Sequence, residues 1–293
     1  MKRFFILLAV AVTAVACDSA DDSSAEIKSA PKRAGWDLFQ LYGDVKEVTV
    51  WEYQADNDGQ TPKAGDTNFK RIYTFNENGD LKCSKDYVRG KNLVSETKYE
   101  YNGMGYLTKA IYTNNYDGML AYAEYIYDKD GNLTKERSAY EYYIDSEITH
   151  RYNEQGQKIE STTQTYNDWD EVETTKYRYN QDDELIELIN YTGEEETSRT
   201  EFKYDDKGRC IEVTQTDSHS GNVIYQKLTT YDKYSNIAEE TYTHTYLGAS
   251  STTSQIYEYE YDNHGNPTSL IKYMDENGEK VAIEIYKYEI QYR

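Results

Sequence analysis

The sequence has few aliphatic and few basic residues. Its 293 residues contain only three prolines, three cysteines and six phenylalanines. Taking the aromatic 14% from the apolar 38% leaves 24% for Ala, Val, Ile, Leu, Met and Cys together, which is low for a packed two-layer core of this length. Lys and Arg total 32 against 53 Asp and Glu, for a net charge of -21. This acidity excludes a basic nucleic-acid binder.

Long hydrophobic runs are also missing. The longest apolar stretch, residues 4–16, has 13 residues, whereas a membrane-spanning helix needs about 20. A multi-span membrane protein is therefore excluded.

What the chain does have is tyrosine, 33 in all. An aromatic content of 14% is too high for a disordered chain, and tyrosine favours β-strands. We therefore predict an all-β protein whose core is built from tyrosine.

The first 17 residues have the pattern of an export signal. Lys2 and Arg3 precede the apolar stretch, which ends directly before Cys17. The segment Ala14-Val15-Ala16-Cys17 resembles the lipobox of bacterial lipoproteins. That resemblance implies cleavage before Cys17 and lipidation of its sulfur, with several acyl chains forming a stable membrane anchor. The alternative is an ordinary secretory signal with an incidental cysteine.

These features predict three segments: a lipoprotein signal peptide at 1–16, a flexible acidic tether at 17–35 and a single β-sheet domain at 36–293. Losing Lys2 and Arg3 with the signal takes the net charge from -21 to -23, so lipid rather than attraction to anionic headgroups must hold the protein at a membrane. Asp18, Asp21 and Asp22 resemble the acidic signal that sends some lipoproteins to the surface of the Gram-negative outer membrane; the alternative is a merely polar tether. We therefore expect a lipid-anchored, surface-exposed outer-membrane protein.

A nine-residue phrase recurs along the rest of the chain. It reads aromatic, any, aromatic, Asn or Asp, two of any type, Gly, any, apolar, as in Tyr125 to Leu133. We call its second aromatic position the anchor. The eight anchors are Phe75, Tyr101, Tyr127, Tyr152, Tyr179, Tyr204, Tyr231 and Tyr261. Their spacing of 25 to 30 residues indicates eight copies of one structural unit.

The phrase is typical of a β-hairpin. Alternating aromatic and polar residues predict a strand with one buried face. The Asn or Asp after each anchor can accept a hydrogen bond from the amide two residues on, and the Gly supplies the left-handed conformation of a turn with a G1 bulge. Asp183 and Ser235 replace this Gly in two copies. Ser235 tolerates positive φ less well than Asp183, so its turn is expected to be the most strained or to be built differently.

Residues 125–133, 202–209 and 259–266 are similar to the YD repeat of RHS-family proteins. The resemblance covers roughly residues 70 to 292 and implies a curled sheet that acts as a shell, scaffold or binding surface, with carbohydrate binding often attributed to it. Eight hairpins plus end strands at 45–53 and 283–292 predict an all-β, curled antiparallel meander of about 18 strands. Cys83 and Cys210 are five repeats apart along this sheet, so we predict free thiols; closure of the sheet into a ring is the alternative that would permit a disulfide.

No sequence motif indicates catalysis or metal binding. The chain lacks CxxC, HExxH, GxSxG and GxxxxGK, and its four histidines lie in different repeats without a second ligand at zinc spacing. Asp128 to Asn132 resembles part of a calcium loop, but the turn explains the same residues. We therefore predict no enzyme, no cofactor and no metal site.

The functional hypothesis is a lipid-anchored envelope lipoprotein whose sheet binds or scaffolds a glycan or an envelope or host protein. Trp51 and Trp169 are the candidate binding residues, because exposed aromatic rings suit both kinds of partner; ordinary packing is the alternative for both. Two other functions stay open: a structural surface coat without a ligand, and a carbohydrate-active enzyme.

Overall fold

The computed structural model describes residues 41–56, 63–140, 143–166, 172–276 and 279–293. The expected signal peptide at 1–16 and tether at 17–35 lie outside these residues and stay predictions. Within the described ranges every regular element is a β-strand. No helix in these ranges has the length and apolar character to cross a membrane.

The strands group into two compact units, which we describe separately. The middle unit comprises the described residues of Ala121–Asn222, and the N–C unit comprises those of Arg33–Leu120 and Val223–Arg293. The strands of the middle unit are β6 (Leu120–Tyr127), β7 (Leu133–Tyr140), β8 (Tyr143–Tyr152), β9 (Lys158–Thr165), β10 (Val172–Tyr179), β11 (Leu185–Thr192), β12 (Glu195–Tyr204) and β13 (Cys210–Asp217). The expectation of one domain over 36–293 stays a prediction.

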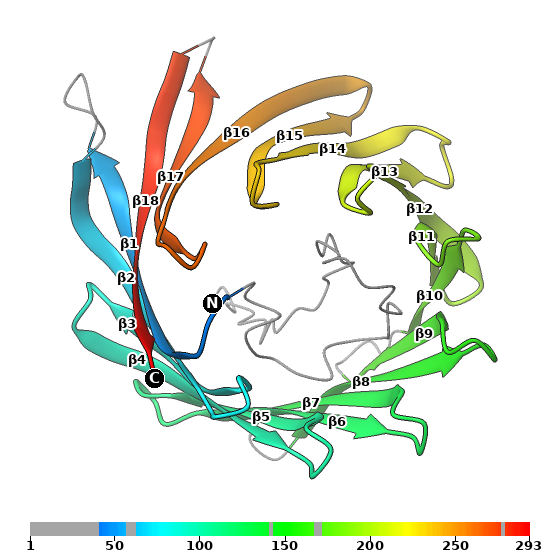
Figure 1. The fold of residues 1–293 in the computed structure, drawn as a ribbon. Helices are drawn as coiled ribbons and strands as arrows, with labels where there is room; N and C mark the ends of the chain where they lie inside the picture. The colour runs from blue at the N-terminus through cyan, green and yellow to red at the C-terminus, as the bar shows by residue number, and fades with distance from the viewer. Residues whose placement is uncertain (1–40, 57–62, 141–142, 167–171, 277–278) are drawn as a thin grey trace. The chain divides into compact units, whose positions relative to one another are not determined.

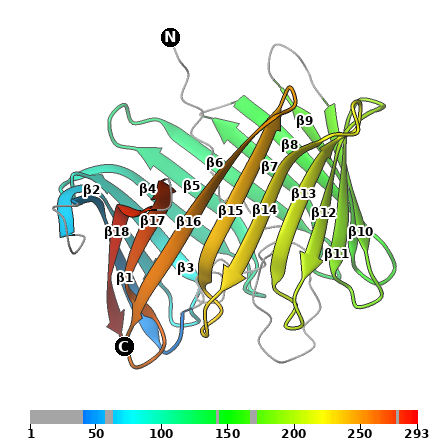
Figure 2. The same cartoon turned by 90° about the horizontal axis from the view of Figure 1, so that it is seen from above.

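The N–C unit contains the first and the last of the described strands. Its strands are β1 (Val45–Asp56), β2 (Lys63–Phe75), β3 (Leu81–Val88), β4 (Asn92–Tyr101), β5 (Leu107–Asn114), β14 (Val223–Tyr231), β15 (Ile237–Tyr246), β16 (Ala249–Tyr261), β17 (Pro267–Glu276) and β18 (Glu279–Tyr292). β1 pairs antiparallel with both β18 and β2, so the first and last strands are neighbours (Figure 1). Figure 2 shows β14 to β17 side by side in alternating directions.

The predicted fold class is confirmed. The described residues form 18 strands in antiparallel hairpins, and the two end strands include the ranges expected from the sequence. The repeat therefore encodes one strand pair per copy.

The turn after each anchor is the same in all eight copies. After Phe75, for example, Asn76 Oδ1 accepts hydrogen bonds from the amides of Asn78 and Asp80, both at 2.9 Å. Gly79 has φ 81°, and the β2–β3 register shifts by one residue between Thr74 and Phe75, as a G1 bulge requires. The predicted Asx-started, bulged turn is thus confirmed.

Ser235 occupies the glycine position of its turn with φ 67°. Its amide donates to the carbonyl of Asp232 at 3.2 Å, and Asp232 donates to the carbonyl of Asn236 at 2.8 Å, as in the other copies. The turn is therefore not built differently, and the strain of a left-handed L-residue stays in place.

Four anchor tyrosines connect their repeat to the one before it by a hydrogen bond. The Tyr152 hydroxyl donates to the backbone carbonyl of Leu133 at 2.6 Å, where Leu133 occupies the apolar position of the preceding repeat. The same bond joins Tyr101 to Leu81, Tyr179 to Lys158 and Tyr204 to Leu185. In these four repeats backbone carbonyls therefore satisfy the tyrosine hydroxyls.

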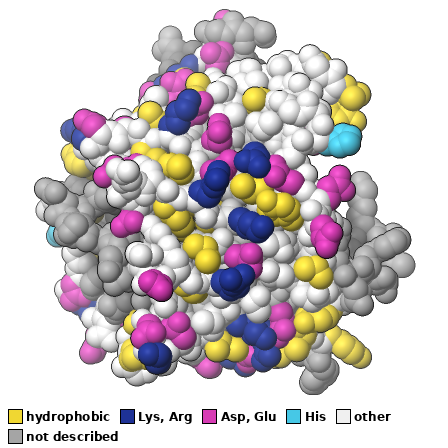
Figure 3. Space-filling model, turned by 90° about the vertical axis from the view of Figure 1, so that its right-hand side faces the viewer, with side chains coloured by type: hydrophobic (Ala, Val, Ile, Leu, Met, Phe, Trp, Pro, Cys, Tyr) yellow, Lys and Arg dark blue, Asp and Glu magenta, His cyan; other side chains and the backbone are white. Residues whose placement is uncertain are grey.

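The residue between the two aromatic positions faces solvent, as predicted. Glu100, Arg151, Arg178, Lys203 and Glu260 are all exposed. In the middle unit three of these positions form cross-strand ion pairs: Arg151 with Glu160, Arg178 with Glu187 and Lys203 with Glu212. Figure 3 shows one face of the molecule, where basic and acidic side chains are interspersed. Exposed pairs of this kind stabilise by at most about 1 kcal/mol each, so they contribute little to the stability of the fold.

Cys83 and Cys210 are both free cysteines. Burial, reinforced by the neighbouring Glu96 carboxylate, raises the pKa of the Cys83 thiol to about 11.

Candidate binding site between two repeat turns

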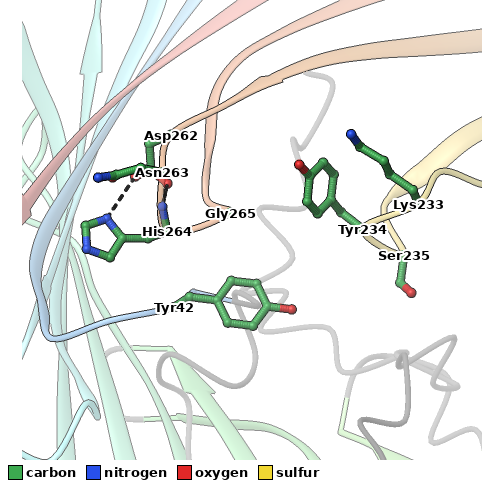
Figure 4. A pocket seen from close by; sticks show the side chains of 8 residues that line it. All are labelled: Tyr42, Lys233, Tyr234, Ser235, Asp262, Asn263, His264 and Gly265. Atoms are coloured by element: carbon green, nitrogen blue, oxygen red, sulfur yellow. Dashed lines mark hydrogen bonds and ion pairs between the residues drawn. The ribbon is translucent and has the colours of Figure 1, made fainter.

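Two adjoining hollows lie beside the last two repeat turns of the N–C unit. The first has a volume of about 570 Å³ and is lined by Tyr42, Lys233, Tyr234, Ser235, Asp262, Asn263, His264 and Gly265 (Figure 4). The second, of about 590 Å³, is lined by Asp232, Lys233, Tyr234, Tyr257, Glu258, Tyr259 and Tyr261. Lys233 and Tyr234 line both, so one turn serves the two hollows.

The repeat itself builds both turns. Asp232 Oδ1 accepts from the amide of Tyr234 at 2.8 Å, and Asp262 Oδ1 accepts from the amide of His264 at 2.8 Å. These bonds hold the backbone at Tyr234 and His264, which occupy the same position of successive turns.

Tyrosine hydroxyls bond these two turns differently from the earlier ones. Tyr261 donates to Asp232 Oδ2, and Tyr292 donates to Asp262 Oδ2, whereas four earlier anchors donate to backbone carbonyls. Burial would raise the pKa of Asp262, but the hydrogen bonds from Tyr292 and the turn amides outweigh it and hold that pKa below its usual value. The carboxylate therefore stays charged near neutral pH.

Tyr42 is held at the rim of the first hollow by a buried side chain. Asn266 is fully buried, with 0% exposure. Its Oδ1 accepts from the Tyr42 amide at 2.7 Å, and its Nδ2 donates to the Tyr42 carbonyl at 2.7 Å. The Tyr42 side chain nevertheless remains exposed at 51%, so the backbone is fixed while the ring faces the hollow.

The aromatic rings around the hollows contact one another. Tyr234 and Tyr261 have centroids 4.3 Å apart, and Tyr259 and Tyr261 are stacked at 5.8 Å. His264 lies 4.4 Å from the ring of Tyr292. Lys233 Nζ lies 4.7 Å from the Tyr234 centroid, in a cation–π contact. The result is a continuous aromatic surface with polar groups beside the rings.

The buried carboxylate of Glu240 is hydrogen-bonded to Tyr257, which lines the second hollow. Glu240 is 6% exposed; it accepts from the hydroxyls of Tyr242 and Tyr257 and, at 3.1 Å, from Lys227 Nζ. Burial would raise the pKa of Glu240, but these hydrogen bonds outweigh it and lower the pKa, while burial and Glu240 raise that of Tyr257. Neither group changes protonation near neutral pH, so the cluster fits packing rather than acid–base chemistry.

The middle unit contains a chain of residue types that hydrolases use. His150 Nδ1 lies 2.8 Å from Ser161 Oγ, and His150 Nε2 lies 2.9 Å from Glu136 Oε1. Ser161 is only 6% exposed, and its Oγ also lies 3.1 Å from the Tyr177 hydroxyl. A substrate carbonyl has no open approach to a hydroxyl buried in this way, so the chain fits a satisfied polar network.

No group of three or more His, Cys, Asp and Glu side chains able to hold a metal ion occurs among the described residues. Asp128, in the segment resembling a calcium loop, accepts from the amides of Asp130 and Asn132 through Oδ1 and from Asn132 Nδ2 through Oδ2. The turn thus occupies both oxygens.

Of the residues singled out in the sequence, Cys17 and Trp169 lie outside the described ranges. Trp51 lies on β1, half-buried, with Lys70 Nζ 4.6 Å from its ring. A Cβ built on Gly90 would lie 3.0 Å from Cζ3 of the indole. These contacts fit the packing alternative for Trp51, while partner binding at Trp51 and Trp169 stays a prediction.

Sequence reasoning missed Tyr42, Tyr234 and His264. One signal was available: the second residue after the Asx position is Asn78, Met104, Asp130, Gln155, Asp182 and Lys207 in the first six turns, but Tyr234 and His264 in the last two. Tyr42 lies before the first repeat and gave no such signal.

No protein-family model matches the chain, and no curated protein matches it. Among solved structures, a porin-like protein from Bacteroides uniformis aligns with 86% of this chain and 98% of its own length, at 15% identity and a TM-score of 0.43. A porin-like protein from Bacteroides vulgatus aligns with 85% of this chain and 98% of its own, at 11% identity and a TM-score of 0.35. The TcdB2–TccC3–Cdc42 complex aligns with 78% of this chain and 15% of its own, at 11% identity and a TM-score of 0.40. Similarity this low carries no inference about activity, ligand or location.

Proposed function

We propose that this chain is a lipid-anchored lipoprotein of the bacterial outer membrane, of the YD-repeat type, whose tyrosine-rich sheet binds a glycan or protein partner at the cell surface. The observation that carries the binding function is the pair of adjoining hollows around Tyr234. They combine exposed aromatic rings with a lysine, carboxylates, a hydroxyl and an imidazole. Apolar faces beside a few fixed polar groups are typical of sites that recognise a partner.

The anchor rests on the N-terminal sequence. Cys17 directly follows the apolar stretch 4–16, and the remaining chain is strongly acidic. A chain of this charge is repelled by anionic lipid surfaces, so membrane attachment depends on acyl chains at Cys17.

Labelling with radioactive palmitate tests the anchor. The wild-type protein should incorporate label, and Cys17→Ser should incorporate none. Protease added to intact cells should degrade the wild-type protein if it faces outward. Retained label in Cys17→Ser would refute lipidation at this residue, and protection from protease would refute surface exposure.

A binding survey tests the partner function. The full-length protein, purified in detergent, is presented to envelope polysaccharides, glycan arrays and solubilised envelope and host surface proteins. Saturable binding to at least one of these is expected. Absence of binding to all of them would favour the structural coat.

A further inference from the structure

The side-chain amide of Asn266, which is fully buried, holds the backbone of Tyr42 in place. An asparagine side chain offers one oxygen acceptor and two N–H donors. Asn266 directs its oxygen to the Tyr42 amide and its nitrogen to the Tyr42 carbonyl and, at 2.8 Å, to the Tyr292 hydroxyl. The same repeat position is Asp80, Tyr106, Asn132, Gln157, Glu184, Arg209 and Asn236 in the earlier turns. At Asn266, hydrogen bonds between side chain and backbone join this position to the segment before β1.

The Tyr42 ring has one supported face and one open face. A Cβ built on Gly265 would lie 3.7 Å from Cδ2 of the ring, so the turn backbone lies directly against it. The ring is still 51% exposed, and Figure 4 shows it projecting into the space between the two turns. A rigid aromatic face of this kind binds flat apolar surfaces with little loss of conformational entropy.

Polar side chains line the same hollow as this open face. Lys233, Ser235, Asn263 and His264 bring an amine, a hydroxyl, an amide and an imidazole to the same hollow. Such a mixture of donors and acceptors matches a ligand carrying several hydroxyl groups.

The charges of the hollow disfavour an acidic ligand. Asp262 lines it, its pKa lies below the usual value, and Lys233 is the one lysine or arginine in the lining of this hollow as described. The chain as a whole carries -21, so an anionic ligand would approach against a repulsive field.

From these features we infer that the hollow between turns 232–236 and 262–266 binds one neutral pyranose residue of a glycan, with the apolar face of the sugar stacked on Tyr42 and its hydroxyls bonded to the surrounding polar side chains. The two consecutive turns with an aromatic residue at their second position after Asx, Tyr234 and His264, flank this subsite. The inference rests on the proposed binding function and names its ligand class and its main contact residue.

Isothermal titration of the full-length protein in detergent tests the subsite. The probes are neutral oligosaccharides of glucose, galactose, mannose and N-acetylglucosamine, with oligogalacturonate as the acidic comparison. At least one neutral probe should bind saturably. Tyr42→Ala should lower its affinity by about tenfold or more, because the stacked apolar area is lost.

Two variants control the result. Tyr42→Phe keeps the stacking face, so its loss of affinity should be clearly smaller than that of Tyr42→Ala. Tyr246→Ala removes a tyrosine that is 78% exposed at the end of β15, outside the hollow, and should leave affinity unchanged. Circular dichroism should give Tyr42→Ala the unfolding midpoint of the wild type, because the backbone bonds to Asn266 remain.

The outcomes separate this subsite from the wider function. Neutral-sugar binding that is unaffected by Tyr42→Ala overturns the subsite and leaves a glycan-binding function. Binding of oligogalacturonate alone, or of a protein partner alone, overturns the sugar assignment and leaves the proposed function standing. Binding of neither sugars nor proteins refutes both.

Discussion

The hydrogen bonds from anchor tyrosines to the preceding repeat predict a measurable loss when a single hydroxyl is removed. Tyr152→Phe deletes the donor to the Leu133 carbonyl, which lies 2.6 Å away on a residue that is 1% exposed. A neutral hydrogen bond contributes about 1 kcal/mol net, and a buried acceptor left without its donor adds up to about another 1 kcal/mol. We therefore expect a loss of about 1–2 kcal/mol in the free energy of unfolding.

The assay is urea unfolding followed by far-ultraviolet circular dichroism. Tyr143→Phe is the matched control, because Tyr143 begins the same strand and is 75% exposed; its midpoint should equal that of the wild type. A combined variant with phenylalanine at the four bonded anchors should lose at least about 4 kcal/mol, since well-separated sites add. That loss is a large part of the 5–15 kcal/mol typical of native proteins.

Equal midpoints for Tyr152→Phe and Tyr143→Phe would refute the role of the anchor hydroxyls. The tyrosine at this anchor position would then be explained by ring packing alone, and phenylalanine would serve as well there.

Three further predictions concern strain, buried charge and thiol reactivity. Ser235→Gly should raise the free energy of unfolding in urea by about 0.5–1 kcal/mol, because φ 67° is strained for serine. Gly131→Ala, at φ 83°, should lower the free energy of unfolding. A lower stability of Ser235→Gly than of the wild type would contradict the argument. Glu240→Gln should lower stability by roughly 2 kcal/mol at pH 7. The pKa of Glu240 is lowered in the fold, so its stabilisation is complete above the ordinary value of 4.5 and is lost as pH falls through the folded value; the difference between wild type and variant should shrink below about pH 4.5, and a constant difference would contradict this. Cys83, with its pKa raised from 9.0 to about 11, should react with iodoacetamide at pH 8 about 100-fold more slowly than an unperturbed thiol, and peptide mapping showing equal rates would contradict the burial of this group.

The repeat made most of the fold predictable from sequence. Turn chemistry is local: an Asx side chain and a left-handed residue lie within five positions, so spacing alone located eight hairpins and their bulges. Of the two alternatives expected for the Ser235 turn, the structure excludes a different build and keeps the strain, because hydrogen bonds of the turn hold even an unfavourable residue in the shared geometry.

The candidate site was much less predictable. Tyr42 and Asn266 are 224 positions apart in the sequence, and a contact between residues so far apart produces no periodic sequence pattern. His264 was considered only as a metal ligand, whereas its place in the structure is beside Tyr292 at the rim of a hollow. The two tryptophans were predicted as binding residues from their residue type alone, but Trp51 packs against Lys70 and Gly90.

Hydrogen–deuterium exchange is the most direct test of where a partner binds. The full-length protein in detergent is measured alone and with a saturating amount of the envelope polysaccharide or protein found in the binding survey. Binding at the hollows predicts slower exchange in turns 232–236 and 262–266 and unchanged exchange in turn 128–132, which has the same Asx bonds but lines neither of these two hollows. Protection confined to other segments, or equal protection of all three turns, would contradict the account.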